Sequence, residues 1–299
     1  MSEGKPSRAR SLAEYLDLQG RIGEAADIPG AIESFHPRAT DVIISPFGKS
    51  GTTWLQQIFH CLRTGGDTDF DDISRVVPWI ETSRFVGLDL EASQRADPRG
   101  FKSHLSFTHI PKGARYLVSV RDPKDALVSA FHFMEGWFFE PGAVTLDEFA
   151  QLWLAEGSRA GDYWSHLTSW WEQRHRADVM VLSYESMTKD AEQSIRRVAD
   201  HCGLPVDDEL VATTIELSSF AFMLEHKDKF DDRLMREALE RRGLLPPGGD
   251  SSKVRQGGVG GHRQELSPDV VSAMDQIWAR RIEPELGFVD YEALEAAIG

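Results

Sequence analysis

Short apolar runs, turn residues and apolar positions at helical spacing follow one another in the same order at several places along the 299-residue chain. The first run, Val-Ile-Ile at 42–44, is β-branched and predicts a buried strand. Residues 45–51 contain a proline and two glycines, which indicates a tight loop. Beyond the loop, apolar residues recur at helical spacing at Trp54, Leu55, Ile58, Phe59 and Leu62. The pattern therefore predicts a strand, a loop and a helix.

Two further segments repeat this order. Residues 116–120 predict a strand that Arg121 ends. Asp122 can cap the helix that follows, and Pro123 suits its first turn. Residues 178–187 (DVMVLSYESM) predict another strand that runs into a turn. Strands that alternate with helices in this way favour an α/β fold.

A chain of this length, 41% hydrophobic, can bury one large core. We expect a single domain over residues 1–299, with a central, mainly parallel sheet flanked by helices. In this outline, residues 1–38 form an N-terminal extension and helix. Residues 243–263 form a glycine-rich lid loop, because so many glycines disfavour a stable helix or strand.

The first loop carries phosphate-binding chemistry. A strand–loop–helix order directs free backbone N–H groups and the positive end of a helix at one point. Lys49 adds a charge, and hydroxyl donors follow at Ser50, Thr52 and Thr53. The triphosphate-binding pattern G-x-x-x-x-G-K-[ST] would place its first glycine at position 43, where the chain has Ile43. The loop is therefore shorter and suits a smaller group, such as a single phosphate.

Other segments add cations and a candidate base. Arg121, at the end of the second strand, and Ser129, about two turns into the next helix, could reach one phosphate. Lys102 and His104 lie two residues apart, on the same face of an extended chain. A histidine beside a lysine is a plausible general base, because the cation lowers its pKa. In residues 251–263, Arg255 can approach a charged ligand along with the bare glycine backbone.

Bulk properties exclude several classes of function. A net charge of −15 argues against general nucleic-acid binding. No apolar stretch is long enough to span a membrane, and Cys61 and Cys202 lie in helical apolar patterns typical of reduced core residues. We therefore expect a cytoplasmic protein. His104 and His109 lack partner ligands at metal-site spacing, so no metal site is expected.

The segments KSGTTW, RGFKSHL, VRDPKDALVSAFHF, LSYESM, SSFAFM and VRQGGVGGHR resemble, in order and spacing, those of the cytosolic sulfotransferases. The resemblance runs from about Ile43 to Arg263, with weaker similarity at PWIE and WEQRH. It implies the transfer of a sulfuryl group from 3′-phosphoadenosine 5′-phosphosulfate (PAPS) to a hydroxyl or amine of a small, largely apolar alcohol, phenol or amine. The product nucleotide would be 3′,5′-adenosine bisphosphate (PAP), and no metal is required.

The resemblance also implies a role for each matched residue. The donor's 5′-phosphosulfate would lie on Lys49, Ser50, Gly51, Thr52 and Thr53, and its adenine would stack on Trp54. The 3′-phosphate would be held by Arg121, Ser129, Arg255, Gln256 and Gly257. The rest of the adenine would be surrounded by Tyr184, Ser218, Phe220 and Met223. The catalytic group would comprise His104 as base with Lys49, Lys102 and Ser129, and the acceptor pocket would contain Trp79, Phe107 and Phe133.

The chain departs from the family pattern at a few positions. Gly48 replaces the usual proline before the loop lysine, and Gln256 replaces the lysine of an Arg-Lys-Gly triplet. Gly261-His262-Arg263 replaces Asp-Trp-Lys. The family's C-terminal dimer motif is not recognisable, so the oligomeric state stays open. Two alternative functions also stay open: a Mg²⁺-dependent small-molecule kinase or nucleoside triphosphatase, and a non-catalytic protein that binds adenosine bisphosphate.

Overall fold

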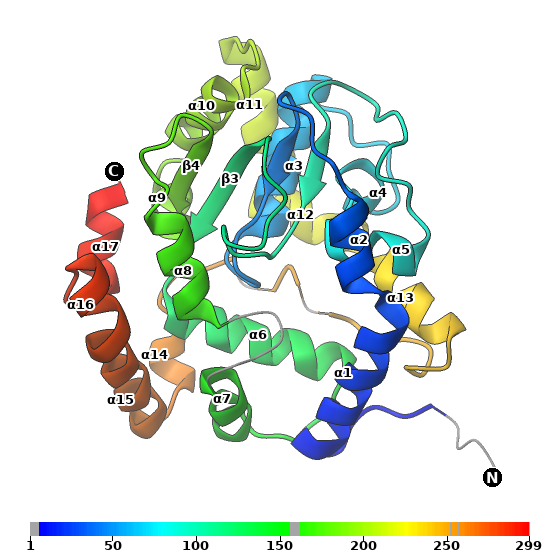
Figure 1. Ribbon diagram of the computed structural model, residues 1–299, viewed down its shortest axis with the longest axis vertical. Helices are drawn as coiled ribbons and strands as arrows, with labels where there is room; N and C mark the ends of the chain where they lie inside the picture. Colours follow the sequence, from blue (N-terminus) through cyan, green and yellow to red (C-terminus); the bar gives the residue numbers. More distant parts are fainter. Residues whose placement is uncertain (1–5, 156–161, 252, 256, 299) are drawn as a thin grey trace.

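A four-stranded parallel sheet lies at the centre of the protein, as the computed structural model shows (Figure 1). The structure describes residues 6–155, 162–251, 253–255 and 257–298. The strands are β1 (Val42–Ile44), β2 (Gly100–Lys102), β3 (Arg115–Val120) and β4 (Val179–Ser183), and their order in the sheet is β2-β1-β3-β4. The predicted parallel sheet is therefore confirmed, and its strands end along one common edge.

The strands are buried on both faces, which explains their β-branched, apolar sequences. Successive residues of β1 alternate between two cores. Ile43 packs with residues of α6 (Pro123–Trp137) and α8 (Tyr163–Trp171), whereas Val42 and Ile44 pack with residues of α3 (Thr52–Thr64) and α10 (Ala191–Cys202). The sheet thus separates two helical layers.

The other helices complete these layers and the outer shell. The N-terminal and central ones are α1 (Leu12–Ala26), α2 (Ile28–Ser34), α4 (Ile73–Val76), α5 (Ser83–Val86), α7 (Leu146–Leu154), α9 (Tyr184–Lys189), α11 (Asp208–Leu217) and α12 (Phe220–Glu225). The C-terminal ones are α13 (Arg233–Arg241), α14 (His262–Glu265), α15 (Pro268–Ile277), α16 (Glu283–Leu286) and α17 (Tyr291–Ile298). Short 3₁₀ turns lie at η1 (Ile80–Thr82) and η2 (Lys227–Lys229), and a π-helical turn lies at η3 (Trp278–Ile282).

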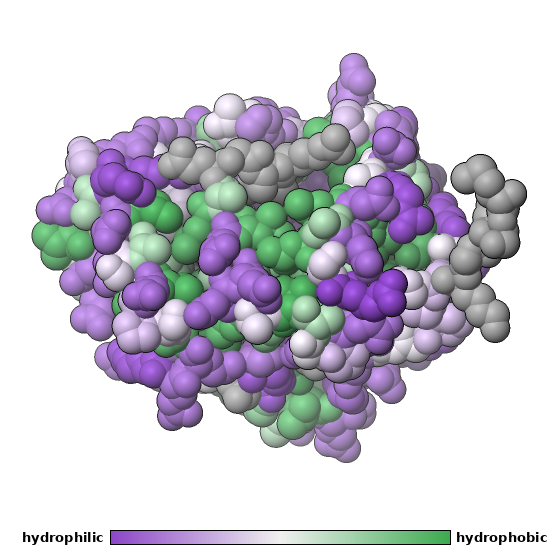
Figure 2. Space-filling view, turned by 90° about the horizontal axis from the view of Figure 1, so that it is seen from below, coloured by the Kyte–Doolittle hydropathy of each residue, from purple (hydrophilic) through white to green (hydrophobic). Residues whose placement is uncertain are grey.

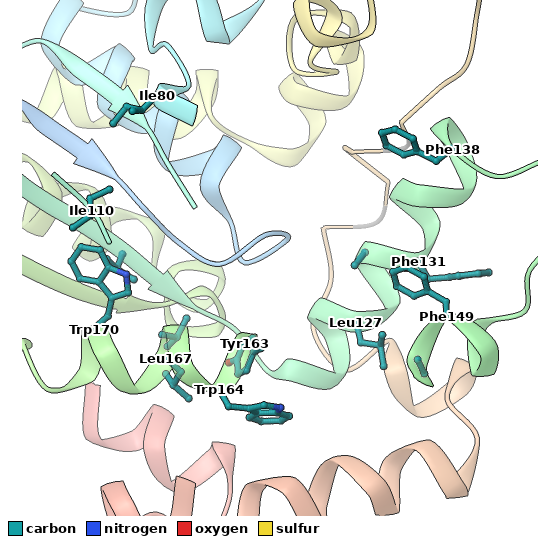
Figure 3. Close-up of a cluster of buried hydrophobic side chains, with 14 of the residues drawn as sticks. Ile80, Ile110, Leu127, Phe131, Phe138, Phe149, Tyr163, Trp164, Leu167 and Trp170 are labelled. Carbon is teal, nitrogen blue, oxygen red and sulfur yellow. The ribbon is translucent and has the colours of Figure 1, made fainter. Parts of the chain in front are cut away.

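Aromatic side chains dominate the larger core (Figure 3). Trp164, Leu167, Trp170 and Trp171 of α8 are buried there, as their helical spacing predicts. Cys61 and Cys202 are buried and free. None of the described helices is both long and apolar enough to cross a membrane. The face seen from below in Figure 2 carries hydrophobic residues across its middle, with hydrophilic residues around them.

The strand order fixes where a ligand can bind. From β1 the chain passes to β2 on one side, and it then returns to β3 on the other side of β1. Loops that leave the carboxyl ends of β1 and β3 therefore diverge, and open α/β sheets bind ligands at such a switch point. The loop at residues 45–51 and Arg121 follow these two strand ends. Asp122 caps α6 by accepting a hydrogen bond from the Lys124 amide at 2.8 Å.

Two glycine substitutions should have opposite effects on stability. A Cβ at Gly100, in β2, would lie 2.2 Å from Cε1 of the buried Phe59 ring, so Gly100→Ala should destabilise the fold by about 1–3 kcal/mol through overpacking. A Cβ at Gly20, inside α1, would meet no atom within 4 Å, so Gly20→Ala should stabilise it by roughly 0.5–1 kcal/mol. Urea unfolding measures both, and equal free energies for the two variants would contradict the packing of Phe59 on β2.

Candidate active site

The loop after β1 holds two residues in left-handed backbone conformations. Lys49 has φ of 69° and Gly51 has φ of 96°. A Cβ at Gly51 would lie 2.9 Å from the Tyr184 ring, so this position requires glycine. Lys49 adopts a conformation that costs a non-glycine residue roughly 1–2 kcal/mol, and such strain concentrates at functional sites. Gly51 is also the N-cap of α3 and provides no side-chain cap, so the helix presents its N-terminal end to the loop.

Arg121 links this loop to the glycine-rich segment. Its Nη1 donates to the Lys49 carbonyl at 3.0 Å, and its Nη2 donates to the Gly258 carbonyl at 3.1 Å. The guanidinium lies over the Tyr184 ring, 4.5 Å from the centroid. Neither hydrogen bond neutralises the charge, because both acceptors are carbonyl groups. The positive charge therefore stays available beside the loop.

Several donors around the loop are buried yet have no hydrogen-bond partner among the described residues. They are Ser50 Oγ, Thr52 Oγ1, Trp54 Nε1 and Arg121 Nε. Buried donors are nearly always paired in native proteins, so a group of unpaired ones needs an explanation. An anion with several acceptor oxygens would satisfy them.

Three lysines converge on the same region. Lys102 is buried, and its Nζ lies 3.4 Å from Asp232 Oδ1. Lys253 Nζ lies 2.6 Å from the other oxygen, Asp232 Oδ2. Burial lowers the pKa of Lys49 to about 7, with Lys253 the strongest charge effect in the same direction. Burial lowers the pKa of Lys102 to about 8, although Asp232 opposes that shift. Cations thus outnumber the carboxylate that pairs with them here.

His104 is held as a neutral base. Its Nδ1 lies 2.8 Å from the Pro46 carbonyl, which can only accept, so the proton is on Nδ1 and the Nε2 lone pair is free. Its amide donates to Glu81 Oε1 at 2.7 Å. Burial and then the Lys102 charge lower the pKa of His104 to about 3. The imidazole is therefore unprotonated at neutral pH and can accept a proton.

Trp79 brings Lys102 and His104 together. Its ring lies edge-on to the His104 imidazole at 5.1 Å, and Lys102 Nζ lies 4.0 Å from its centroid. Lys49 Nζ lies 4.7 Å from the centre of the Phe133 ring, which projects from α6. Two of the three expected pocket aromatics, Trp79 and Phe133, are therefore beside Lys102 and Lys49. The third, Phe107, packs instead against Trp170 and Tyr116 near the start of β3.

The residues expected around adenine form two groups. Trp54 lies edge-on to Tyr184 with centroids 5.6 Å apart. Gly257 has φ of 61°, and a Cβ there would lie 2.5 Å from the Phe220 ring, so loop backbone packs directly on this exposed aromatic. Met223 is buried. Ser218 Oγ is already engaged, since it donates to the Thr214 carbonyl at 2.6 Å.

The expected 3′-phosphate residues are only partly assembled. Ser129 is half-buried on α6, the helix that Arg121 precedes. Arg255 Nη2 lies 3.7 Å from Glu265 Oε1, so this cation faces a carboxylate. Gln256 lies outside the described residues. A Cβ at Gly48 would meet no atom within 4 Å, so the replacement of proline there leaves the loop unobstructed.

The chain was compared with known proteins. A model of the sulfotransferase domain matches residues 39–292. The chain belongs to the sulfotransferase family. Human sulfotransferase 1C2 is 25% identical over 280 residues, covering 89% of this chain and 92% of that protein. Luciferin sulfotransferase of Photinus pyralis is 24% identical over 287 residues, covering 84% of this chain and 73% of that protein.

Solved structures share the fold. Mouse sulfotransferase SULT7A1, complexed with PAP, superposes with a TM-score of 0.68 at 23% identity, covering 87% of this chain and 91% of that one. A retinol dehydratase in complex with androsterone and PAP gives a TM-score of 0.69 at 19% identity, covering 89% and 86%. Because the sulfotransferase domain model matches residues 39–292, the activity of this chain is sulfuryl transfer. Among the described residues, no group of three or more His, Cys, Asp or Glu side chains is arranged to hold a metal ion.

The sequence analysis did not identify several residues of this sulfotransferase site. Asp232 and Lys253 pair beside Lys102, and Glu81 orients the backbone of His104. Asp125 accepts from the Gly260 amide at 2.6 Å, and from both the amide and Nδ1 of His262 at 3.0 and 2.8 Å. Glu81 lies inside the PWIE segment and Lys253 directly precedes VRQGGVGGHR, so proximity to the motifs was a usable signal. No local pattern marks Asp232.

The His104 tautomer can be tested directly. We predict that its imidazole stays neutral between pH 8 and pH 5, with the proton on Nδ1, because its pKa is lowered to about 3 and the Pro46 carbonyl accepts from Nδ1. Nitrogen chemical shifts of ¹⁵N-histidine-labelled protein measure both properties, and His104→Gln assigns the signal. A titration midpoint near 6.5, the ordinary histidine value, would contradict the assignment.

Proposed function

We propose that this sulfotransferase uses PAPS and transfers its sulfuryl group to a hydroxyl or amine of a small, largely apolar acceptor. The observation that supports this most strongly is the group of buried, unpaired donors around the loop, next to an excess of cations. A donor that carries phosphate and sulfate oxygens matches both features. Two similar structures are described as complexes with PAP, the nucleotide that PAPS leaves behind.

The residues present fit this donor. Lys49, with the loop residues Ser50 to Thr53, would hold the phosphosulfate at the N-terminal end of α3. Arg121 would hold the 3′-phosphate with Ser129, and Arg255 would join them by exchanging Glu265 for the phosphate. Trp54 and Tyr184 would border adenine on one side and Phe220 with Gly257 on another.

The donor supplies an activated sulfuryl group. His104 Nε2 would accept the proton of the acceptor's hydroxyl or amine, since its lone pair is free. Lys49 and Lys102 would stabilise the negative charge that develops on the bridging oxygen, and Ser129 would help to orient the donor. Because both lysines are buried, their charges act in a poorly solvated environment, where such stabilisation is strong.

The acceptor would lie against Trp79 and Phe133. These rings are next to His104 and Lys49, respectively, so an apolar body between them would bring its nucleophilic group to the base. Phe107 is left out of the proposed pocket, because its ring packs against Trp170 and Tyr116 instead.

PAP should stabilise the protein against heat, whereas ATP with Mg²⁺ should not. At about 100 times its Kd, a ligand that binds only the native state adds roughly 2.7 kcal/mol to the free energy of unfolding.

Arg121→Ala should weaken PAP binding by roughly 1.5–3 kcal/mol, as for loss of a charged hydrogen bond. Thermal shift and calorimetric titration measure these effects. Arg196→Ala is the matched control, because that arginine pairs with Glu192 and Asp208 on the surface.

Three results would redirect the proposal. Stabilisation by ATP and Mg²⁺ alone would mean that the short loop accepts a triphosphate, and the kinase alternative would replace the sulfotransferase donor. Equal PAP affinity for Arg121→Ala and the unmodified protein would place the 3′-phosphate elsewhere. PAP binding without turnover of PAPS on any alcohol, phenol or amine would favour the non-catalytic alternative.

His104→Ala should abolish sulfuryl transfer while PAP affinity is retained. The reason is that His104 provides the base but none of the loop donors. Turnover with PAPS and a phenol, measured beside PAP titration, separates these two effects. His109→Ala is the control, because His109 Nδ1 interacts with Ser106 at an exposed position. Retained turnover in His104→Ala would assign the base to another residue.

A further inference from the structure

Asp232 is an unusual residue at the start of α13. Its side chain is 6% exposed, and it lies 130 positions from Lys102 in the sequence. Its backbone has φ of 48°, a left-handed conformation that aspartate tolerates better than most residues. The two carboxylate oxygens point to different lysines, Oδ1 to Lys102 and Oδ2 to Lys253. A buried carboxylate shared between two ammonium groups requires a specific reason.

Support for the helix is not that reason. Asp232 occupies the N-cap position of α13, where aspartate normally accepts a backbone hydrogen bond, but its side chain caps nothing. Asp72 caps the start of α13 instead, because its Oδ2 accepts a hydrogen bond from the Leu234 amide at 2.9 Å. The orientation of the Asp232 carboxylate is therefore explained by the two lysines and not by α13.

Lys253 lies on the chain that leads into the glycine-rich loop. Its side chain is 11% exposed, and its Nζ has no hydrogen bond of good geometry among the described residues, although it is ion-paired with Asp232. An ammonium group has three donors, so most of its hydrogen-bonding capacity is unused. Lys253 also has the strongest charge effect on Lys49, which places its ammonium close to the phosphate loop.

We propose that Lys253 is a further donor-binding lysine, which contacts the phosphosulfate oxygens, and that Asp232 is the positioning residue that holds Lys253 and Lys102 toward the donor. The proposal rests on the proposed function, because it deepens the assignment of the same site. It adds a third ammonium group to Lys49 and Lys102.

The charges explain why one carboxylate serves two lysines. Burial disfavours a charged ammonium group, and neighbouring cations lower its pKa further. Asp232 opposes this for Lys102 and Lys49, because its negative charge raises the pKa of both and favours their protonated forms. A carboxylate for every lysine would cancel the charge that attracts the donor. A single one leaves the region positive.

The alternative is that Lys253 binds an acidic acceptor instead of the donor. The structure favours the donor, because Lys253 pairs with the same carboxylate as Lys102 and is the strongest of the charges that act on Lys49 of the phosphate loop. The rings assigned to the acceptor, Trp79 and Phe133, contact Lys102 and Lys49 instead. If Lys253 binds the donor, the KM for PAPS depends on Lys253. If it binds the acceptor, the KM for the acceptor does.

The decisive variant is Lys253→Met, which keeps the length of the side chain and removes its charge. We expect PAP affinity to fall tenfold or more, and the KM for PAPS to rise, with little change in the KM for a neutral phenol. Lys253→Arg should recover most of the affinity, since arginine retains the charge. Lys227→Met is the matched control, because Lys227 forms an exposed pair with Asp250 at 2.6 Å.

Asp232→Asn tests the positioning role without backbone strain, because asparagine also tolerates the left-handed conformation. Loss of the carboxylate removes the effect that raises the pKa of Lys49 and Lys102, so kcat/KM for PAPS should begin to fall at a lower pH. A purely structural role would lower the unfolding free energy and leave this pH profile in place. The charged or titratable groups around these lysines that shape the profile are Asp72, His104, Arg121, Asp231 and Lys253.

Each result has a defined meaning. If the unmodified protein binds PAP and Lys253→Met binds it equally well, the inference fails and the proposed function stands. If only the KM of an acidic acceptor changes, Lys253 belongs to the acceptor site and the inference fails. If the unmodified protein binds no PAP, the proposed function and the inference fail together. An Asp232→Asn variant that does not fold is replaced by Asp232→Asn combined with Lys253→Met, which leaves only Lys102 without its carboxylate and still allows the pH profile to be measured.

Discussion

Burial of several ammonium groups beside one carboxylate is the constraint on which the active site depends. Transfer of a charge from water into a protein is costly unless the charge is paired. Here Asp232 is ion-paired with Lys102 and Lys253, and it opposes the fall that burial causes in the pKa of Lys49 and Lys102. The free protein keeps these charges only because the carboxylate remains ionised, and its pKa is held well below the ordinary value by the same lysines.

This local excess of positive charge contrasts with the net charge of the whole chain, which is −15. The acidic surface of such a protein repels polyanions, whereas its cation-rich site suits a small anion. The parallel sheet produces that place. It brings the loop after β1 beside the end of β3, so that Lys49, Arg121 and the N-terminal end of α3 meet at the switch point.

The sequence predicts those parts of the molecule that depend on neighbouring residues. The strand–loop–helix order, the cap at Asp122 and the buried face of α8 are local, and all are present in the structure. Contacts between distant segments were not predictable in this way. Asp232 meets Lys102 across 130 positions, and its left-handed backbone has no signature in the sequence.

The same limit explains why two residues expected at the site, Phe107 and Arg255, have other partners in the structure. Phe107 lies two residues beyond the motif that contains Lys102 and His104, yet the chain turns after the strand and directs the ring to Trp170. Arg255 is next to the glycines, but the carboxylate it faces, Glu265, comes from α14. In both cases tertiary packing decides the direction of a side chain, and spacing along the chain cannot show it.

The glycine-rich segment is fixed beside the site by contacts with charged side chains. It is held at successive points: Lys253 by Asp232, the Gly258 carbonyl by Arg121, and the Gly260 and His262 amides by Asp125. These contacts hold the backbone against Phe220 and beside the phosphate loop. A site whose donors are fixed in advance loses little conformational entropy when its ligand binds and needs little reorganisation during the reaction. In the proposed mechanism, the carboxylates Asp232 and Asp125 would therefore contribute to sulfuryl transfer through the positions of the groups around them.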